Sequence, residues 1–103
     1  MRACDIPEGI LPTHNALYYA GAWHEPVAGG YAQTFNPAYN EAITTAPVAD
    51  ADDVDAAVRA AHAAFPAWAA TPPAERGRLL RRAAAVLREH AQPLAVLDAL
   101  NNG

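Results

Sequence analysis

Lysine is absent from this chain, and cysteine is nearly so. The seven basic residues among 103 are all arginine, and there is one cysteine. A single cysteine cannot form an intramolecular disulfide, which is consistent with the reducing cytoplasm in which we expect the protein. The formal net charge is -4. Nucleic-acid binding depends on clustered cations that meet phosphates, so we expect no nucleic-acid partner.

Long apolar segments are also missing. No run approaches the roughly 20 apolar residues that a membrane span requires, so we expect no membrane partner. Residues 1–8 lack the apolar stretch of a secretory signal. Hydrophobic residues make up 52% of the chain, but 27 residues are alanine and only 19 are Leu, Ile, Val or Phe. This number of large apolar side chains is low for a chain that must form a hydrophobic core by itself.

The first half of the chain predicts an arm followed by short strands. Residues 1–16 lack periodicity and contain Pro and Gly, which indicates a flexible N-terminal arm. Segments 17–23, 31–36 and 42–46 are short, aromatic or β-branched, and separated by turn residues. They predict three strands in an antiparallel hairpin or meander.

From Asp50 the apolar spacing becomes helical. Val54, Val58 and Phe65 recur on one face, and Asp50 is a predicted N-cap. Pro66 predicts either the end of this helix or a kink.

A second helix is predicted after Thr71, which is its candidate N-cap. Its apolar face comprises Leu80, Ala84, Leu87, Ala91 and Leu94. Pro93 predicts a kink or a restart, which allows a third helix. The fold class is therefore α+β, with N-terminal antiparallel strands followed by two or three helices and with no βαβ alternation.

Residue chemistry alone provides no catalytic constellation. Cys4 is a candidate nucleophile, but it lies in the predicted arm beside Asp5, whose charge disfavours a thiolate. The four histidines lack the close spacing of a zinc site. Gly29–Gly30 does not match a dinucleotide-binding turn, because no predicted helix follows it directly.

Five ordered motifs across residues 17–103 resemble the N-terminal portion of the aldehyde dehydrogenase superfamily. The motifs are an apolar strand ending in Gly-x-Trp (17–23), a T-x-N-P-A-T-G-E-like turn (34–41), the first helix (53–61), the next junction (64–68 with 73–76) and an L-D-N-G-like sequence (100–103).

The resemblance implies the incomplete N-terminal part of the cofactor-binding domain of an α/β, NAD(P)-dependent enzyme. Such an enzyme oxidises aldehydes to carboxylic acids through a cysteine thiohemiacetal. The family's catalytic residues and glycine-rich cofactor turn lie beyond residue 103, so we expect no catalytic or cofactor-binding residue, no bound NAD or NADP, and no activity from this segment. The expected partners are the remainder of such a fold or, in a full-length enzyme, further copies of it.

The resemblance also implies one site. Many members hold a structural monovalent cation at positions that correspond to Thr34, Phe35 and Asn101. Asn101 replaces the family's aspartate, which removes a charge from the site, while oxygen ligands suit a hard cation. The alternative hypothesis is that the chain is a non-enzymatic interaction module or one subunit of a split dehydrogenase.

Overall fold

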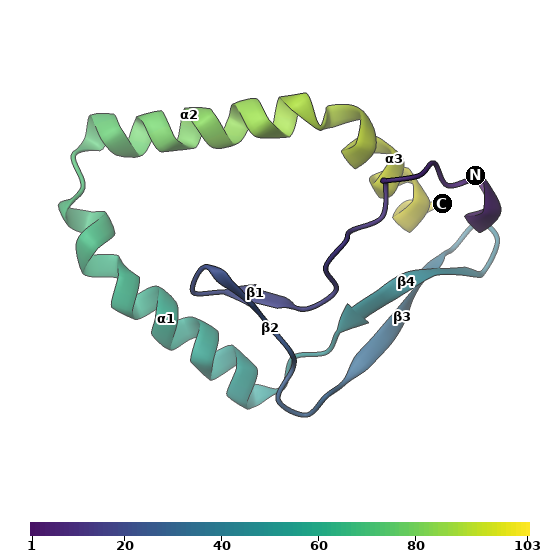
Figure 1. Ribbon diagram of the computed structural model, residues 1–103, viewed down its shortest axis with the longest axis horizontal. Coiled ribbons are helices and arrows are strands. Elements are labelled where there is room, and N and C mark those ends of the chain that lie inside the picture. Colours follow the sequence, from purple (N-terminus) through teal and green to yellow (C-terminus); the bar gives the residue numbers. More distant parts are fainter.

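The computed structural model describes the backbone of residues 1–103 and every side chain except that of Ala3. Two antiparallel strand pairs precede three helices, which confirms the predicted α+β class. The helices and strands surround an open centre, and both chain termini lie at the end of the ring where α3 (Ala91–Asn102) meets the second strand pair (Figure 1).

The segment predicted as one strand over residues 17–23 is a hairpin. β1 (Leu17–Tyr19) pairs with β2 (Ala22–His24), so the prediction of a single strand was wrong. Ala20 and Gly21 form the two-residue turn with φ values of 52° and 74°. Positive φ at both turn positions matches the strand twist of a tight hairpin, and glycine adopts it without strain.

The second strand pair forms a separate two-stranded sheet. β3 (Tyr31–Asn36) pairs antiparallel with β4 (Glu41–Pro47), in agreement with the strands predicted there. The register shifts between Thr34, which faces Thr44, and Phe35, which faces Ala42. One extra residue of β4 therefore stands opposite the Thr34–Phe35 step, as in a β-bulge. The two sheets are not joined into one meander.

The first helix begins where the sequence predicts. The Asp50 side chain accepts hydrogen bonds from the Asp52 and Asp53 backbone amides, and Asp53 completes a capping box, so α1 (Ala51–Ala70) has a firm N-terminus. The helix passes through Pro66, so the alternative in which Pro66 ends it was wrong. Alanine has the highest helix propensity, and three of the four residues after Pro66 are alanine.

The junction of the next helices differs in detail from the prediction. Thr71 ends α1, where its hydroxyl donates to the Ala67 carbonyl at 2.8 Å; it does not cap α2 (Pro73–Glu89), whose N-cap is Pro72. Proline early in a helix costs little because its missing N–H has no partner there in any case. The chain restarts at His90 as α3, three residues before Pro93.

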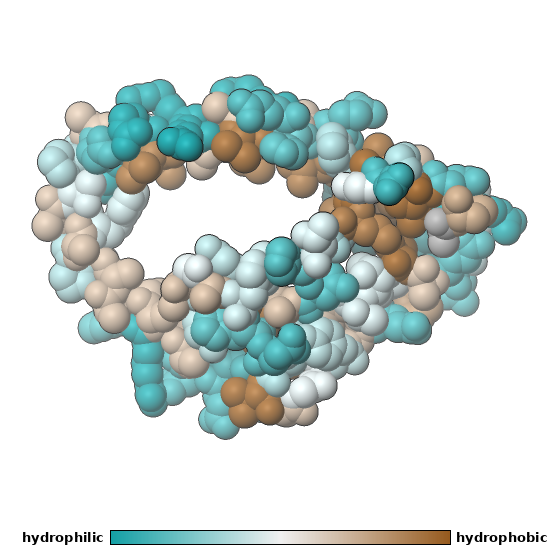
Figure 2. All heavy atoms as spheres, viewed as in Figure 1, coloured by the Kyte–Doolittle hydropathy of each residue, from teal (hydrophilic) through white to brown (hydrophobic). Residues whose placement is uncertain are grey.

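The molecule is expanded for its length. Its radius of gyration is 17.1 Å, whereas a compact domain of this size has about 13 Å. Its accessible surface is 7464 Å², whereas a folded monomer of 10.9 kDa exposes about 5,600 Å². The space-filling view shows an opening through the molecule, with apolar side chains of α2 along its edge (Figure 2).

Few side chains are buried in this expanded fold. Among the described side chains, Leu100 is the only buried hydrophobic residue, at 2% exposed, while Phe65, Leu80 and Leu87 are 60% exposed or more. Asn36 and Asp53 are buried polar residues that hydrogen bonds to the backbone satisfy. The predicted shortage of large apolar residues thus appears as a missing core.

The N-terminal segment lies against the rest of the chain. A 3-10 helix, η1 (Ala3–Asp5), contacts β4, and the Arg2 guanidinium lies 5.0 Å from the centre of the Tyr39 ring. Residues 9–13 and α2–α3 line one cavity together. The flexibility of residues 1–16 and the boundary at residue 17 stay predictions. Within the part of the chain that the structure describes, no helix is long and apolar enough to cross a membrane.

Candidate functional site

A cavity of about 250 Å³, which we call the polar cavity, lies between the β3–β4 sheet and α3, and its polar residues stand among apolar ones such as Ile43 and Leu97. Thr34 of β3, Thr44 of β4 and Asn101 of α3 line it. Asn15, from the segment before β1, reaches the same cavity. The β3–β4 hairpin, the segment before β1 and α3 therefore bring hydroxyl and amide groups to one place.

Two hydrogen bonds to Thr44 organise this cavity. The Thr34 hydroxyl donates to the Thr44 backbone carbonyl at 3.2 Å, and the Asn15 side-chain amide donates to the Thr44 hydroxyl at 3.2 Å. The donor end of the Asn15 amide is therefore held against β4. Its oxygen, Oδ1, is buried and has no hydrogen-bond partner among the described residues. Such a buried, unsatisfied acceptor costs about 1–3 kcal/mol unless a ligand or water meets it.

The structure brings together two of the three residues to which the resemblance assigns a cation. Thr34 and Asn101 line the same cavity, although Asn101 is largely exposed. The Phe35 side chain is 47% exposed and is not part of the lining. Phe35 nevertheless follows Thr34 at the register shift, where the ladder between β3 and β4 is interrupted. Cation binding at these residues stays a prediction.

The donor set of the cavity fits a hard monovalent cation. Hydroxyl and amide oxygens are hard ligands, and the unpartnered Asn15 oxygen is one of them. Among the residues that the structure describes, none of those lining this cavity is acidic. Calcium sites in proteins usually include carboxylates, so this neutral set suits Na⁺ or K⁺ better than a divalent ion.

Asn15 and Thr44 are the contributions that sequence reasoning missed. Asn15 stands in an irregular segment, and Thr44 is one of several strand threonines, so neither carries a motif. Only the pairing of β4 with β3 and the packing of α3 against β3 place them beside Thr34.

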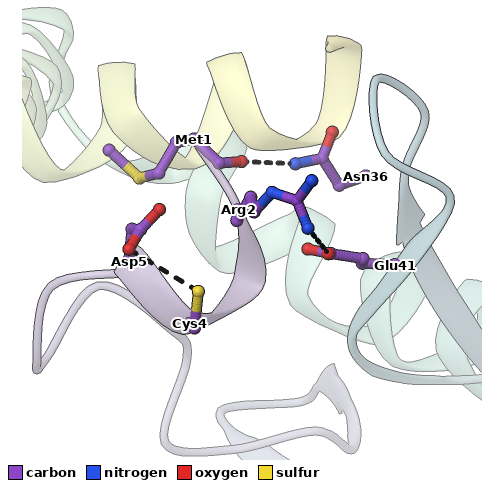
Figure 3. Close-up of polar contacts among 6 residues, drawn as sticks. All are labelled: Met1, Arg2, Cys4, Asp5, Asn36 and Glu41. Atoms are coloured by element: carbon purple, nitrogen blue, oxygen red, sulfur yellow. Dashed lines mark hydrogen bonds and ion pairs between the residues drawn. The ribbon is translucent and has the colours of Figure 1, made fainter.

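Cys4 lies outside this site and lacks the environment of a nucleophile. Its thiol is exposed and donates to the Asp5 carboxylate at 3.5 Å, while the neighbouring Arg2 pairs with Glu41 at 3.4 Å (Figure 3). A catalytic thiol needs a cation, a base or a helix N-terminus that stabilises its thiolate. Asp5 instead places a negative charge beside the thiol.

The remaining candidates do not form a metal or phosphate site either. Among the described residues, no three His, Cys, Asp or Glu side chains are grouped so that they could hold a metal ion. Gly29 closes a turn through its amide to the Pro26 carbonyl at 2.8 Å, and Gly30 leads into β3. A pyrophosphate cradle needs backbone amides at a helix start, which this loop does not provide.

Two surface pairs shift pKa values away from the cavity. The Arg78 guanidinium hydrogen-bonds to Glu75 in the first turns of α2, which lowers the pKa of that carboxyl. The Tyr31 hydroxyl donates to the Glu25 carboxylate, which raises the pKa of Tyr31. Both pairs are exposed and lie on the outside of the fold, so they stabilise local structure rather than a site.

Apolar side chains form most of the lining of two further cavities. One, of about 330 Å³, lies between α3 and the β3–β4 turn, and Met1, Asn36 and Leu100 are part of its lining. The other, of about 510 Å³, lies between residues 9–13 and the end of α2 with α3. Both continue the exposed apolar surface of the helices and carry few polar groups.

The sequence and the fold both match proteins of one family. The aldehyde dehydrogenase family model matches residues 23–103. Aldehyde dehydrogenase tropH of Talaromyces stipitatus is 45% identical over 96 residues, which cover 93% of this chain and 19% of that protein. N-succinylglutamate 5-semialdehyde dehydrogenase of Serratia proteamaculans is 45% identical over 83 residues, which cover 81% of this chain and 17% of that protein. The chain thus spans less than a fifth of these relatives, at their N-terminal end.

Two solved structures share the fold. The crystal structure of PnpE in complex with nicotinamide adenine dinucleotide superposes with a TM-score of 0.80 at 45% identity, over 84% of this chain and 18% of that one. A putative aldehyde dehydrogenase from Burkholderia cenocepacia gives 0.81 at 43% identity, over the same shares of the two chains.

Proposed function

The chain belongs to the aldehyde dehydrogenase family, and from this premise we propose that its 103 residues form the N-terminal structural segment of an NAD(P)-dependent enzyme. The reaction is the oxidation of an aldehyde to a carboxylic acid, in which bound NAD or NADP accepts the hydride. The NAD complex of PnpE, 45% identical over 84% of this chain, supports both the cofactor and placement in the cofactor-binding domain.

The segment contributes scaffold rather than chemistry. Cys4 is exposed beside a carboxylate, the Gly29–Gly30 loop leads into a strand, and the described residues hold no cluster of titratable groups that could ligate a metal. Within the part of the chain that the structure describes, we assign neither the nucleophile nor the cofactor cradle of this reaction to any residue. We therefore assign no turnover to these 103 residues alone.

The observation that carries this proposal is the exposed apolar surface of the helices. Leu80 and Leu87 are seven residues apart on α2, which is about two helical turns and places them on one face, and both are at least 60% exposed. The accessible surface exceeds that of a compact monomer by roughly 1,900 Å², which is the scale of a large protein interface. The occupant that fits is the remainder of the dehydrogenase fold. Assembly into homo-oligomers and residence in the cytoplasm complete the proposal.

The polar cavity supplies a structural cation site within this scaffold. The Thr34 hydroxyl, the backbone at Phe35 and the Asn101 amide are the proposed ligands, and the cation's role is to tie α3 to the interrupted β3–β4 ladder. Thr34 and Asn101 line one cavity, which supports the assignment. The ion takes no part in the oxidation.

A second hypothesis is that the chain is a separate subunit of a split dehydrogenase or another interaction module. The same exposed apolar surface favours it, because such a surface on a soluble chain marks an interaction site. The two hypotheses differ in whether the chain, expressed by itself, forms a stable stoichiometric complex with a partner chain.

The test uses the purified 103-residue chain. We expect no reduction of NAD or NADP with a panel of aldehydes, and clear turnover contradicts the scaffold role. The chain is then mixed with the Serratia relative from which the matching N-terminal sixth has been removed. Size-exclusion chromatography that shows a one-to-one complex favours the split subunit, whereas aggregation of the chain favours a segment that functions only within a continuous fold.

A further inference from the structure

The buried oxygen of Asn15 is the feature that the proposed scaffold leaves unexplained. Its side chain donates to the Thr44 hydroxyl at 3.2 Å, which fixes the amide nitrogen on β4. The amide oxygen is consequently directed away from that partner, is buried, and accepts no hydrogen bond from any described residue. Buried polar atoms in native proteins are almost always satisfied, so this oxygen marks a position where an ion or a water molecule would remove the cost of the unmade contact.

The surroundings define what that group is. The cavity beside Asn15 measures about 250 Å³, which admits an ion together with water, and Thr34 and Asn101 also line it. Both Thr34 and Asn15 use their donor groups on Thr44. Their oxygen lone pairs remain available as acceptors, so Thr34 and Asn15 can offer electron-rich oxygens to a ligand, beside the Asn101 amide and the His14 ring that also line the cavity.

We propose that the Asn15 side-chain oxygen is a direct ligand of a monovalent cation, Na⁺ or K⁺, in this cavity. The inference rests on the proposed cation site and adds to it a ligand from the segment before β1. Because Asn101 stands where the resemblance places an aspartate, the site relies on neutral oxygens, and Asn15 supplies one of them. The ion then links that segment to β3 and α3.

The experiment measures cation-dependent unfolding of the 103-residue chain by circular dichroism. Melting midpoints are compared in equal concentrations of KCl, NaCl and choline chloride, since the methyl groups of choline keep protein oxygens from ligating its charged nitrogen directly. We expect K⁺ or Na⁺ to raise the midpoint by at least about 3 °C over choline, because a ligand that binds only the folded state stabilises it. The sodium NMR line width, which broadens when the ion binds, gives a second readout.

Variants of Asn15 test whether its oxygen binds the cation, and a control variant tests for a general effect on folding. Asn15→Leu removes the oxygen and is expected to lose most of the cation-dependent shift, while Asn15→Asp adds a charge and is expected to enlarge it. Asn102→Leu is the matched control: the Asn102 amide donates to the Asp98 carbonyl at 2.8 Å outside the cavity, and the variant should retain the full shift.

Each outcome decides one claim. A wild-type shift that Asn15→Leu retains overturns the role of Asn15 but leaves the site at Thr34, Phe35 and Asn101 standing. A wild-type chain that melts at the same midpoint in all three salts, and that does not broaden the sodium line, overturns the cation itself and indicates that water alone meets the Asn15 oxygen. Neither result bears on the scaffold role, which the activity and complex-formation tests address.

Discussion

The Asp53 carboxylate accepts a hydrogen bond from the Val27 backbone amide at 3.0 Å, across 26 residues of sequence. The same carboxylate accepts from the Asp50 amide at 3.1 Å, so one buried side chain both caps α1 and holds the loop between β2 and β3. In a chain with little apolar core, this polar link fixes the position of the first helix relative to the strands.

Replacement of Asp53 should therefore be among the most damaging single changes. Asp53→Ala leaves the part-buried backbone amides of Val27 and Asp50 without their carboxylate acceptor, and we expect a loss of about 2–3 kcal/mol in the free energy of unfolding. Urea denaturation followed by circular dichroism measures it. The neighbouring Asp55→Ala loses only an exposed pair with Arg59 and should change the stability by less than about 0.5 kcal/mol. Equal effects of the two variants would contradict the assigned link.

Asn36 is the corresponding polar anchor of the β3–β4 turn. Its amide donates to the Met1 carbonyl at 2.7 Å and its oxygen accepts from the Ala38 amide at 3.0 Å. Asn36→Ala should cost about 1–3 kcal/mol and accelerate hydrogen exchange of the Ala38 amide. Asn36→Asp keeps the acceptor for Ala38 but not the donor to Met1, so its Ala38 amide should stay protected. Loss of that protection in Asn36→Asp contradicts the assigned turn geometry.

The hairpin turn offers a stabilising change. Ala20 has φ of 52°, a left-handed conformation that costs an alanine about 1 kcal/mol or more relative to glycine. We expect Ala20→Gly to raise the free energy of unfolding by roughly 0.5–1 kcal/mol. Ala22→Gly, on the adjacent strand β2, should lower it instead, because glycine weakens a strand. A loss of stability in both variants rules out the positive-φ turn.

The Glu75–Arg78 pair predicts a dependence of stability on pH. The hydrogen bond from Arg78 lowers the pKa of Glu75 in the folded chain. The stabilisation is therefore present above the ordinary pKa of Glu75 and is lost as the pH falls through the lowered value. Glu75→Gln and Arg78→Ala should each flatten that acidic slope, and the double variant should flatten it no further. Additive effects in the double variant indicate that the two residues do not interact.

Local sequence signals predicted the helices well but the strand pairs less well. Asp50 with the spacing of Val54 and Val58 fixed the start of α1, because capping and helical periodicity act within a few residues. The β1–β2 hairpin was missed because Ala20–Gly21 lacks the Asn-Gly or Asp-Gly signature of such turns. Pro66 was read as a possible helix end, yet the alanines that follow it keep α1 helical.

The candidate site was predictable only in part. The motif around Thr34 and the one around Asn101 could be recognised separately, and the structure places both on one cavity. Asn15 could not be found, since it belongs to no motif and its oxygen becomes buried only when β4 and α3 lie beside it. Side chains from irregular segments depend on tertiary packing, which periodicity does not report.

In the proposed scaffold role, the exposed apolar helix faces are the surface on which the rest of a dehydrogenase packs. The most direct measurement is the activity of a chimera in which this chain replaces the matching N-terminal segment of the Serratia N-succinylglutamate 5-semialdehyde dehydrogenase. Leu80, 64% exposed on α2, is replaced by Asp in one variant, and the exposed Arg82 is replaced by Asp in the control.

We expect NAD(P)H formation by the chimera and by Arg82→Asp, with a loss of at least about tenfold in soluble, active enzyme for Leu80→Asp. A chimera that is active to the same extent with Leu80→Asp as without it would contradict the claim, as would a chimera that folds as a soluble protein but shows no activity.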